Sequence, residues 1–166
     1  MPETNVARIQ LRAATAVDAR RLWEWRNDED ARRASIDTTP VPWEKHVEWL
    51  ARLLADANTR LLVLEVDGAP AGQARLDLLE AGADAELSFA IAPEFRGRGL
   101  AAPLIRTATA FACSELGANA VTAIVRVENV RSLRAFANAD FMRTGEEFVQ
   151  GARCYRFRHD CYRSGG

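Results

Sequence analysis

A short run of arginine and glycine, Arg96-Gly97-Arg98-Gly99-Leu100-Ala101, carries the clearest chemical signal in this sequence. It follows an apolar strand pattern and opens a helix pattern, at a place where a capping Ser or Asp is the usual choice. The first N–H groups of a helix have no partner within it, and glycines let a ligand approach the backbone without meeting a Cβ atom. With the helix dipole and two arginines added, the run predicts a cradle for a phosphate group.

Two familiar phosphate-binding patterns do not fit this run. No Gly-Lys-Ser/Thr follows it, as a nucleotide triphosphate loop requires, and there is no GxGxxG with an acidic residue about twenty positions later. The alternative interpretation of the run is a solvated arginine pair at a helix start that glycines have loosened. The elements around the run must separate the two interpretations.

Hydrophobic periodicity predicts alternating strands and helices around the run. Strands are expected at 8–13, 60–66, 69–79, 86–92, 119–125, 141–148 and 152–159, with an Asp67-Gly68 turn between the second and third. Helices are expected from a Thr15–Asp18 capping box to about Asn27, over 43–56, from the run to Gly117, and over 129–138. The polar stretch between the first two helices has no predicted element. The order βααβββαβαββ predicts one mixed α/β domain over residues 1–166, in which 86–92 and 119–125 form a parallel pair.

The composition is that of an ordinary soluble domain: 48% hydrophobic residues, 27% charged residues and a formal net charge of −1. Nothing in it suggests binding to nucleic acid or to a membrane surface. No apolar segment at the N-terminus resembles a secretory signal, and none is as long as a membrane span. The cysteines at 113, 154 and 161 lack metal-ligand spacing, so we expect no metal site and reduced thiols in a cytoplasmic protein.

The run, together with the preceding strand AELSFAIAPEF, resembles the signature with which the GCN5-related N-acetyltransferase (GNAT) superfamily binds the pyrophosphate of acetyl-coenzyme A (acetyl-CoA). The second family element, an Asn-x-x-Ser helix followed by Gly-Phe, is partly present as NVRSLRAFANADF, residues 129–141. The expected element order also matches the superfamily from about residue 8 to residue 160. The resemblance implies the acyl-CoA N-acyltransferase fold of this family, a single splayed mixed sheet of about seven strands flanked by about four helices.

The resemblance also implies where acetyl-CoA binds. The sheet should open between the strands 86–92 and 119–125, and the pantetheine arm should pair with the backbone around Phe89, Ala90 and Ile91. Asn129 and Ser132 fall on positions that contact the coenzyme, although Asn129 also suits a helix N-cap. The residues expected to hold the pyrophosphate are Arg96, Gly97, Arg98, Gly99, Leu100 and Ala101.

Two positions depart from the family pattern. Phe136, which we expect among the coenzyme contacts, stands where many members have a Tyr that protonates the departing thiolate. Because a thiol has a pKa of ~8.5, its thiolate is a tolerable leaving group without strong acid help. Water, Ser132 and Tyr155 are the candidates for supplying that proton. Asp140 replaces the family's Gly, and Asp tolerates left-handed backbone better than most residues.

For the chemistry, the resemblance implies direct attack of a primary amine on the thioester, with the oxyanion held by a backbone N–H of the splayed strand. The amine must first lose a proton. Glu86, on that strand, is the first candidate for the base or for the anchor of a water chain, and a solvent-facing or arginine-paired carboxylate is the alternative. His46 is the second candidate, since its ordinary pKa of ~6.5 suits the task. A packed or exposed histidine without a catalytic role is the alternative there.

The segment WEWRNDEDARR (23–33), with a downstream His-x-x-Trp, is expected to select the acceptor. It is similar to acetyltransferases of nucleotide-linked amino sugars and also to the ribosomal-protein N-terminal acetyltransferases. In the first case Arg26, Arg32 and Arg33 would meet a diphosphate, and tryptophans would stack on a base or sugar. We therefore expect a substrate site at Trp25, Arg26, Asn27, Arg32 and Arg33. The alternative is that Trp23, Trp25 and Trp49 are core residues.

The sequence thus predicts an acetyl-CoA-dependent N-acetyltransferase, acting as a monomer or homodimer. The first acceptor hypothesis is a small molecule such as a UDP-amino sugar, and the second is an N-terminal peptide or another small amine. An alternative of another class is a module that binds acyl-CoA without transferring the acyl group, which Phe136 favours.

Overall fold

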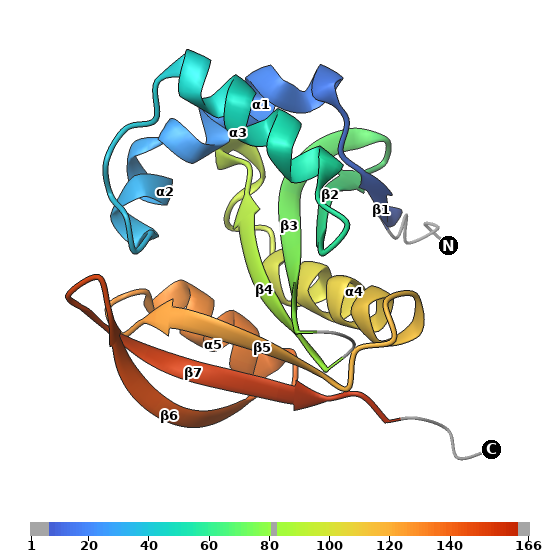
Figure 1. The fold of residues 1–166 in the computed structure, drawn as a ribbon, viewed down its shortest axis with the longest axis vertical. Coiled ribbons are helices and arrows are strands. Elements are labelled where there is room, and N and C mark those ends of the chain that lie inside the picture. The colour runs from blue at the N-terminus through green and yellow to red at the C-terminus, as the bar shows by residue number, and fades with distance from the viewer. Residues whose placement is uncertain (1–6, 81–82, 163–166) are drawn as a thin grey trace, which may run out of the picture.

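The computed structural model describes residues 7–80 and 83–162 and shows one seven-stranded sheet with helices on both faces (Figure 1). Along the sheet the order is β1-β2-β3-β4-β5-β7-β6, in which β4 and β5 are parallel and the other neighbours antiparallel. The strands are β1 (Ile9–Ala13), β2 (Thr59–Val66), β3 (Ala69–Leu79), β4 (Asp84–Ile91), β5 (Ala120–Arg126), β6 (Met142–Val149) and β7 (Ala152–Asp160). This mixed α/β fold confirms the predicted strands and their parallel pair.

The predicted helices are present, and one more lies in the polar stretch that had no predicted element. The helices are α1 (Ala19–Asn27), α2 (Glu29–Ala34), α3 (Trp43–Ala55), α4 (Ala101–Ser114) and α5 (Val130–Asn138), with short 3₁₀ turns at Ala16–Asp18 and Pro93–Phe95. The unexpected helix, α2, has no buried residue, so its sequence lacks the apolar periodicity that would predict a helix. Within the described ranges, no helix combines the length and the apolar character that crossing a membrane requires.

Strand β2 is buried on both faces and supplies two cores. Because successive side chains of a strand point to opposite faces, Leu62 and Leu64 pack in the core under α4 and α5. Leu61 and Val63 pack in the other core, under α1 and α3. Trp25 is buried in this second core, which confirms the interpretation of that tryptophan as a core residue.

The sheet splays where the resemblance places the opening. Strands β4 and β5 pair in register only over Asp84–Glu86 and Ala120–Thr122, and beyond that point they diverge (Figure 1). Strand β7 continues to pair with β5 along its whole length. The sheet therefore consists of a β1–β4 block and a β5–β7 block, and the edge of β4 after Glu86 is left without a neighbouring strand.

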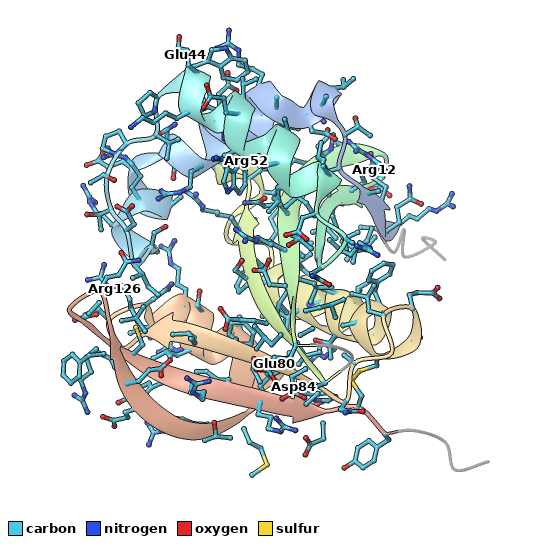
Figure 2. All side chains as sticks on the ribbon, viewed as in Figure 1. Arg12, Glu44, Arg52, Glu80, Asp84 and Arg126 are labelled. Atoms are coloured by element: carbon cyan, nitrogen blue, oxygen red, sulfur yellow. A yellow bond between two sulfur atoms is a disulfide. The ribbon has the colours of Figure 1, made fainter. Side chains whose placement is uncertain are left out.

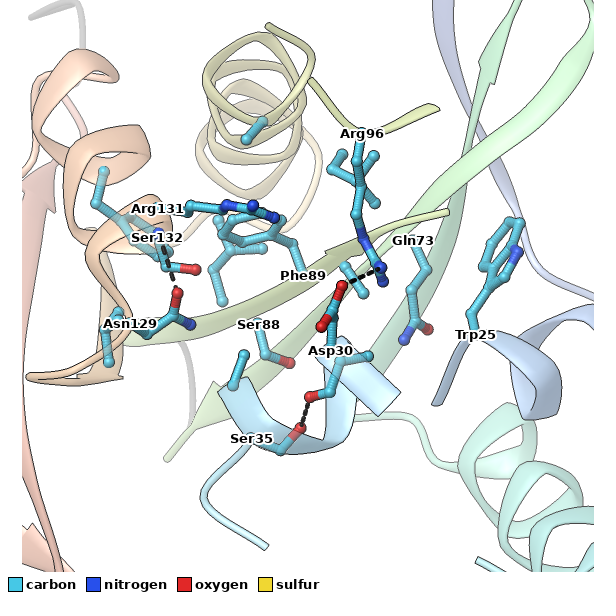
Figure 3. A pocket seen from close by; sticks show the side chains of 18 of the residues that line it. Trp25, Asp30, Ser35, Gln73, Ser88, Phe89, Arg96, Asn129, Arg131 and Ser132 are labelled. Atoms are coloured by element: carbon cyan, nitrogen blue, oxygen red, sulfur yellow. Dashed lines mark hydrogen bonds and ion pairs between the residues drawn. The ribbon is translucent and has the colours of Figure 1, made fainter. Parts of the chain in front are cut away.

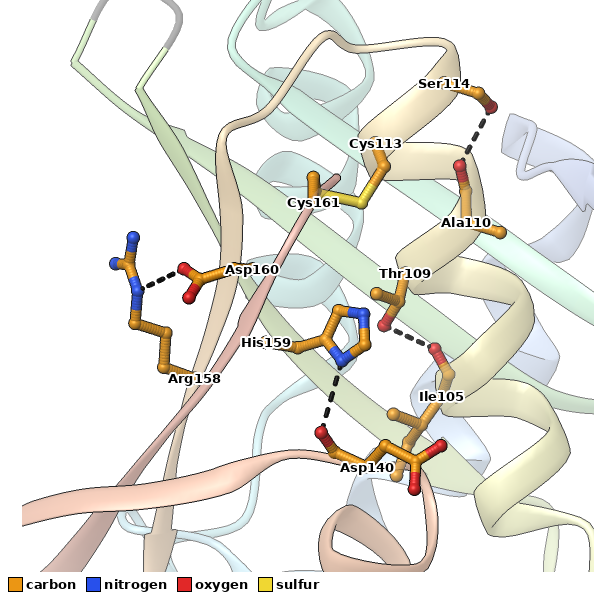
Figure 4. The surroundings of a disulfide bond; sticks show 10 residues. All are labelled: Ile105, Thr109, Ala110, Cys113, Ser114, Asp140, Arg158, His159, Asp160 and Cys161. Atoms are coloured by element: carbon orange, nitrogen blue, oxygen red, sulfur yellow. Dashed lines mark hydrogen bonds and ion pairs between the residues drawn. A yellow bond between two sulfur atoms is a disulfide. The ribbon is translucent and has the colours of Figure 1, made fainter. Parts of the chain in front are cut away.

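The expectation of three reduced thiols is wrong. Cys113, near the end of α4, and Cys161, directly after β7, form a disulfide with Cα atoms 5.5 Å apart (Figure 4). The two residues are 48 positions apart in sequence. They meet because β7 pairs with β5 and the N–H of Cys161 donates to the carbonyl of Asn119, which directly precedes β5 on the loop that follows α4. Cys154 is a free, buried thiol.

Candidate active site

A cleft of about 970 Å³ lies where β4 and β5 diverge (Figure 3). One side of it, called here the α4–α5 side, is formed by the end of β4, the arginine–glycine run, the start of α4 and α5. The opposite side, called the α1–α3 side, is formed by residues of α1, α2, α3, β3 and by Ser88. The predicted site residues that line the cleft are Trp25, Arg26, Phe89, Ala90, Ile91, Arg96, Gly97, Gly99, Leu100, Ala101, Asn129, Ser132 and Phe136.

The glycines of the run have the backbone geometry that a phosphate cradle needs. Gly97 and Gly99 have φ angles of 75° and 70°, and a Cβ atom added at either would meet nothing within 4 Å. Helix α4 begins at Ala101, and no described side chain caps its first N–H groups. These N–H groups can therefore donate hydrogen bonds to an anion, and the open space beside the glycines leaves room for it.

The two arginines of the run are engaged by protein groups. The Arg96 guanidinium pairs with the Asp28 carboxylate at 2.8 Å and lies 3.7 Å from that of Asp30, so it ties the run to α2. Arg98 donates a hydrogen bond to the Glu94 carbonyl and lies over the Phe95 ring, and it does not line the cleft. The cradle therefore rests mainly on backbone groups, with Arg96 at its edge.

Helix α5 supplies positive charge that the sequence interpretation missed. Arg131 and Arg134 are exposed and line the α4–α5 side of the cleft (Figure 3 shows Arg131). Asn129 caps this helix by accepting a hydrogen bond from the Ser132 N–H at 3.2 Å, and both residues also line the cleft. The signal was present in the Asn-x-x-Ser helix itself, where these two arginines occupy positions that were left unassigned.

Phe136 is a packing residue at the wall of the cleft. Its side chain is buried, and its ring centroid lies 5.1 to 5.6 Å from those of Phe89, Phe141 and Phe157. Of the two side chains considered as proton donors, Ser132 lines the cleft, whereas Tyr155 lies under the Arg143 guanidinium and does not. Asp140 has a φ of 66°, the left-handed conformation expected of the residue that replaces the family's glycine.

Glu86 lies at the branch point of the sheet. It is half-buried and stands in register with Asp77 on β3 and Thr122 on β5. Burial raises the pKa of its carboxyl group, and the nearby Asp77 and Glu147 carboxylates raise it further against the opposing effect of Arg156 and Arg75. Glu86 does not line the cleft itself.

His46 is placed away from the cleft. It is buried in α3 between the rings of Trp43 and Trp49, and its Nε2 donates to the Ala19 carbonyl oxygen at 3.0 Å. Burial lowers the pKa of its imidazole, so the ring is neutral near pH 7. The geometry fits a histidine that joins α3 to α1.

The predicted acceptor residues divide into two groups. Trp25 and Arg26 line the α1–α3 side, but Asn27, Arg32 and Arg33 do not. Asn27 exchanges hydrogen bonds with the backbone of Val41, Arg32 donates to the Asn27 carbonyl, and Arg33 pairs with Glu29 and Asp30. These three residues therefore stabilise the α1–α2 region without facing the cleft.

Other residues of the α1–α3 side were missed because they come from elements not tied to the acceptor segment. Gln73 and Arg75 on β3 and Ser88 on β4 lie on the sheet face that Glu86 shares, and Arg75 stands in register with Ser88. Trp49 of α3, the tryptophan of the His-x-x-Trp pattern in the acceptor hypothesis, was not missed and also lines this side. Alternation along β3 and β4 contained the signal, but only the pairing of those strands brings these side chains together.

The charge of the cleft is positive. The charged residues that line it are one carboxylate, Asp30, and six arginines: Arg26, Arg75, Arg96, Arg126, Arg131 and Arg134. Arg26 donates from Nη2 to the Asp37 carbonyl at 2.9 Å, while its Nη1 is buried and has no hydrogen-bond partner among the described residues. An unpaired buried donor on an arginine is costly, so the Arg26 side chain is only partly satisfied by the protein groups around it.

Comparison with known proteins places the chain in a family. Two solved structures with similar folds are spermidine N-acetyltransferase from Vibrio cholerae in complex with CoA and spermine (22% identity, TM-score 0.84) and aminoglycoside acetyltransferase AAC(6′)-Ib in complex with coenzyme A (17% identity, TM-score 0.80). Each match covers 92% of this chain and 95% of the other, and at these identities it shows the fold. No curated protein matches the chain.

Neither neighbour is an amino-sugar or ribosomal-protein acetyltransferase, so these matches do not support the finer resemblance. Residues 8–142 match the model of the acetyltransferase (GNAT) domain. Because that match spans most of the sequence, the chain belongs to the GNAT family and is an N-acetyltransferase whose donor is acetyl-CoA.

Proposed function

We propose that acetyl-CoA binds along the α4–α5 side of the cleft and that its acetyl group passes directly to a primary amine held on the α1–α3 side. The observation that carries this proposal is that the unpaired edge of β4 and the uncapped start of α4 face one cleft. The pantetheine amides would pair with the backbone of Phe89–Ile91, and the pyrophosphate would meet the first N–H groups of α4. Arg131 and Arg134 offer positive charge beside them.

Glu86 is proposed to accept the proton of the amine through water. Ser88 lines the cleft on the same face of β4, two residues beyond Glu86, so the distance to be bridged is short. The Thr122 hydroxyl, in register with Glu86, is buried and has no hydrogen-bond partner among the described residues. A buried hydroxyl of this kind is a typical partner of an ordered water molecule. The raised pKa of Glu86 brings its basicity closer to what a proton acceptor at neutral pH needs.

The acceptor is proposed to carry negative charge near its amine. A polycation such as a polyamine is held by carboxylates, and the single carboxylate that lines this cleft, Asp30, already lies within 3.7 Å of the Arg96 and Arg33 guanidinium groups. Arg26 and Arg75, which line this side of the cleft, instead favour a phosphate or carboxylate. A nucleotide-linked amino sugar fits this pattern, and an N-terminal peptide would fit it if acidic residues followed its amino group.

Release of free CoA from acetyl-CoA tests the proposal. Purified protein would be given a UDP-linked amino sugar, an acidic N-terminal peptide, spermidine or an aminoglycoside, with UDP alone as a protecting ligand in thermal unfolding. We expect acetyl-CoA to raise the unfolding temperature. We also expect turnover with the UDP-amino sugar and protection by UDP. Preferential turnover of spermidine would overturn the anionic acceptor, and the absence of any stabilisation by acetyl-CoA would overturn the donor site.

A further inference from the structure

Helix α2 lines the cleft and is fastened to the protein at both ends. It is only six residues long, and its side chains are not buried. Isolated helices shorter than about 12 residues are marginal in water, so α2 depends on its anchors for its position. Its inner face nevertheless lines the cleft, with Ala31, Ala34 and Ser35.

The first anchor is at the N-terminal end. The Asp28 carboxylate accepts the Ala31 N–H at 3.1 Å, which caps the helix, and pairs with Arg96 at 2.8 Å. Arg96 belongs to the arginine–glycine run, so this end of α2 is fixed to the β1–β4 block at the start of α4. A carboxylate at this position also suits the helix dipole.

The second anchor is at the C-terminal end and comes from the other block of the sheet. Arg126, the last residue of β5, lies beside α2 (Figure 2) and donates from Nη1 to the carbonyls of Arg33 and Ser35, both at 3.0 Å. Carbonyls at a helix C-terminus lack partners within the helix, and a cation there is favourable. More than 90 residues separate Arg126 from these carbonyls in sequence.

We infer that Arg126 is a positioning residue for acetyl transfer: it holds α2 across the opening between β4 and β5, so that α2 walls the thioester and the acceptor amine from bulk water. The inference rests on the proposed use of the cleft. Since Arg126 binds backbone carbonyls on one block and Arg96 binds Asp28 on the other, α2 bridges the two parts of the splayed sheet. Loss of Arg126 would free one end of α2 and leave the cradle and the open edge of β4 in place.

The experiment compares Arg126→Gln and Arg126→Lys with Arg106→Gln. Arg106 is an exposed arginine that donates to the carbonyl of Asn138 at the end of α5, so its loss removes a bond of the same kind elsewhere. Hydrogen exchange of the peptide 28–36 would report on α2, and the release of CoA from acetyl-CoA without added amine would report on water access. The affinity for acetyl-CoA would be measured for each protein.

In Arg126→Gln we expect exchange in 28–36 to become ~10-fold faster and amine-free CoA release to rise several-fold, because local opening exposes these amides and admits water. Arg126→Lys should show smaller changes, since lysine can still donate to both carbonyls. Arg106→Gln should match the wild type in both measurements. The affinity for acetyl-CoA should be unchanged in Arg106→Gln and in Arg126→Lys, which keeps the charge. It should fall no more than a few-fold in Arg126→Gln, which removes one positive charge from the cleft. CoA release is therefore compared with each protein saturated with acetyl-CoA.

Three results would overturn the inference. Unchanged exchange in 28–36 would show that Arg126 does not hold α2. Faster exchange throughout the chain would show general destabilisation instead of positioning. Faster exchange in 28–36 with unchanged CoA release would show that α2 does not shield the thioester. None of these readouts uses the acceptor, so failure of the UDP-amino sugar as a substrate would count against the proposed acceptor and not against this role of Arg126.

Discussion

The two sides of the cleft are built from different parts of the chain. On the α4–α5 side the groups that face a ligand are mainly backbone: the open edge of β4, two left-handed glycines and the start of α4. On the α1–α3 side they are side chains from α1, α2, α3, β3 and β4. Backbone contacts depend on a short local motif, whereas side-chain contacts depend on which elements the fold brings together. This difference explains why the donor follows from the sequence and the acceptor does not.

The arginines on the two sides also differ. Arg131 and Arg134 on the α4–α5 side are exposed, which suits a flexible charge beside a polyphosphate. On the α1–α3 side Arg26 is bonded to the Asp37 carbonyl and Arg75 pairs with Asp77 at 2.9 Å. Fixed guanidinium groups select a ligand by geometry more strictly than mobile ones.

The largest expected effect comes from Gly99→Asp, which alters the backbone groups on the α4–α5 side of the cleft. The added carboxylate would lie at the start of α4, where we propose that the pyrophosphate binds, so we expect the affinity for acetyl-CoA to fall roughly 100-fold or more. Titration calorimetry would measure it. Gly151→Asp is the matched control, because Gly151 has a similar φ of 79° but lies in the β6–β7 turn. Equal affinities in the two variants would refute the cradle.

Glu86→Gln should lower kcat by roughly 10- to 100-fold, since it removes the proposed proton acceptor. In the wild type, the rate should fall as pH drops through the pKa of Glu86, because the protonated carboxyl cannot accept a proton. Burial raises that pKa, so this acidic limb should lie above the ordinary value of 4.5, and it should be absent from the variant. His46→Gln should lose thermal stability but keep the limb. A pH–rate profile unchanged in Glu86→Gln would exclude Glu86.

Arg26→Gln should affect binding on the α1–α3 side of the cleft alone. We expect the KM for an anionic amine to rise by about tenfold while the affinity for acetyl-CoA stays constant, because one charge-assisted contact is lost. Steady-state kinetics with each substrate varied in turn would measure both quantities. A change in the acetyl-CoA parameter of similar size would show that the two sides are not separable.

The smallest effect is expected from Arg131→Gln and Arg134→Gln. Each should weaken acetyl-CoA binding only a few-fold, by about 0.5 to 1 kcal/mol, since exposed charges are screened by solvent and salt. The loss should shrink as salt is added. Arg98→Gln sharpens the test, because Arg98 was expected to bind the coenzyme but does not line the cleft. An equal loss in that variant would restore Arg98 to the donor site.

Much of the fold was predictable, and the misses share a cause. The positions of the strands along the chain and the parallel pair of β4 and β5 follow from local patterns, and the structure contains them. The splay between β4 and β5 and the left-handed turn at Asp140 were expected from the family resemblance, and the structure contains them too. Helix α2 was missed because both of its ends are anchored by arginines distant in sequence, with no buried face of its own. The Cys113–Cys161 disulfide was missed because its cysteines are 48 positions apart and come together only through the pairing of β5 with β7.

By itself, the sequence determined the order of the strands and of the four predicted helices and pointed to a backbone cradle at the start of α4, because each depends on residues that are neighbours in the chain. The coenzyme followed from the resemblance of that run to the GNAT signature. Only the tertiary structure decided that Arg96 is shared with Asp28, that His46 serves packing, and that Arg126 reaches α2. Those outcomes depend on strand pairing and helix packing between segments tens of residues apart. No local spacing encodes such contacts, and they are what shapes the acceptor side of the cleft.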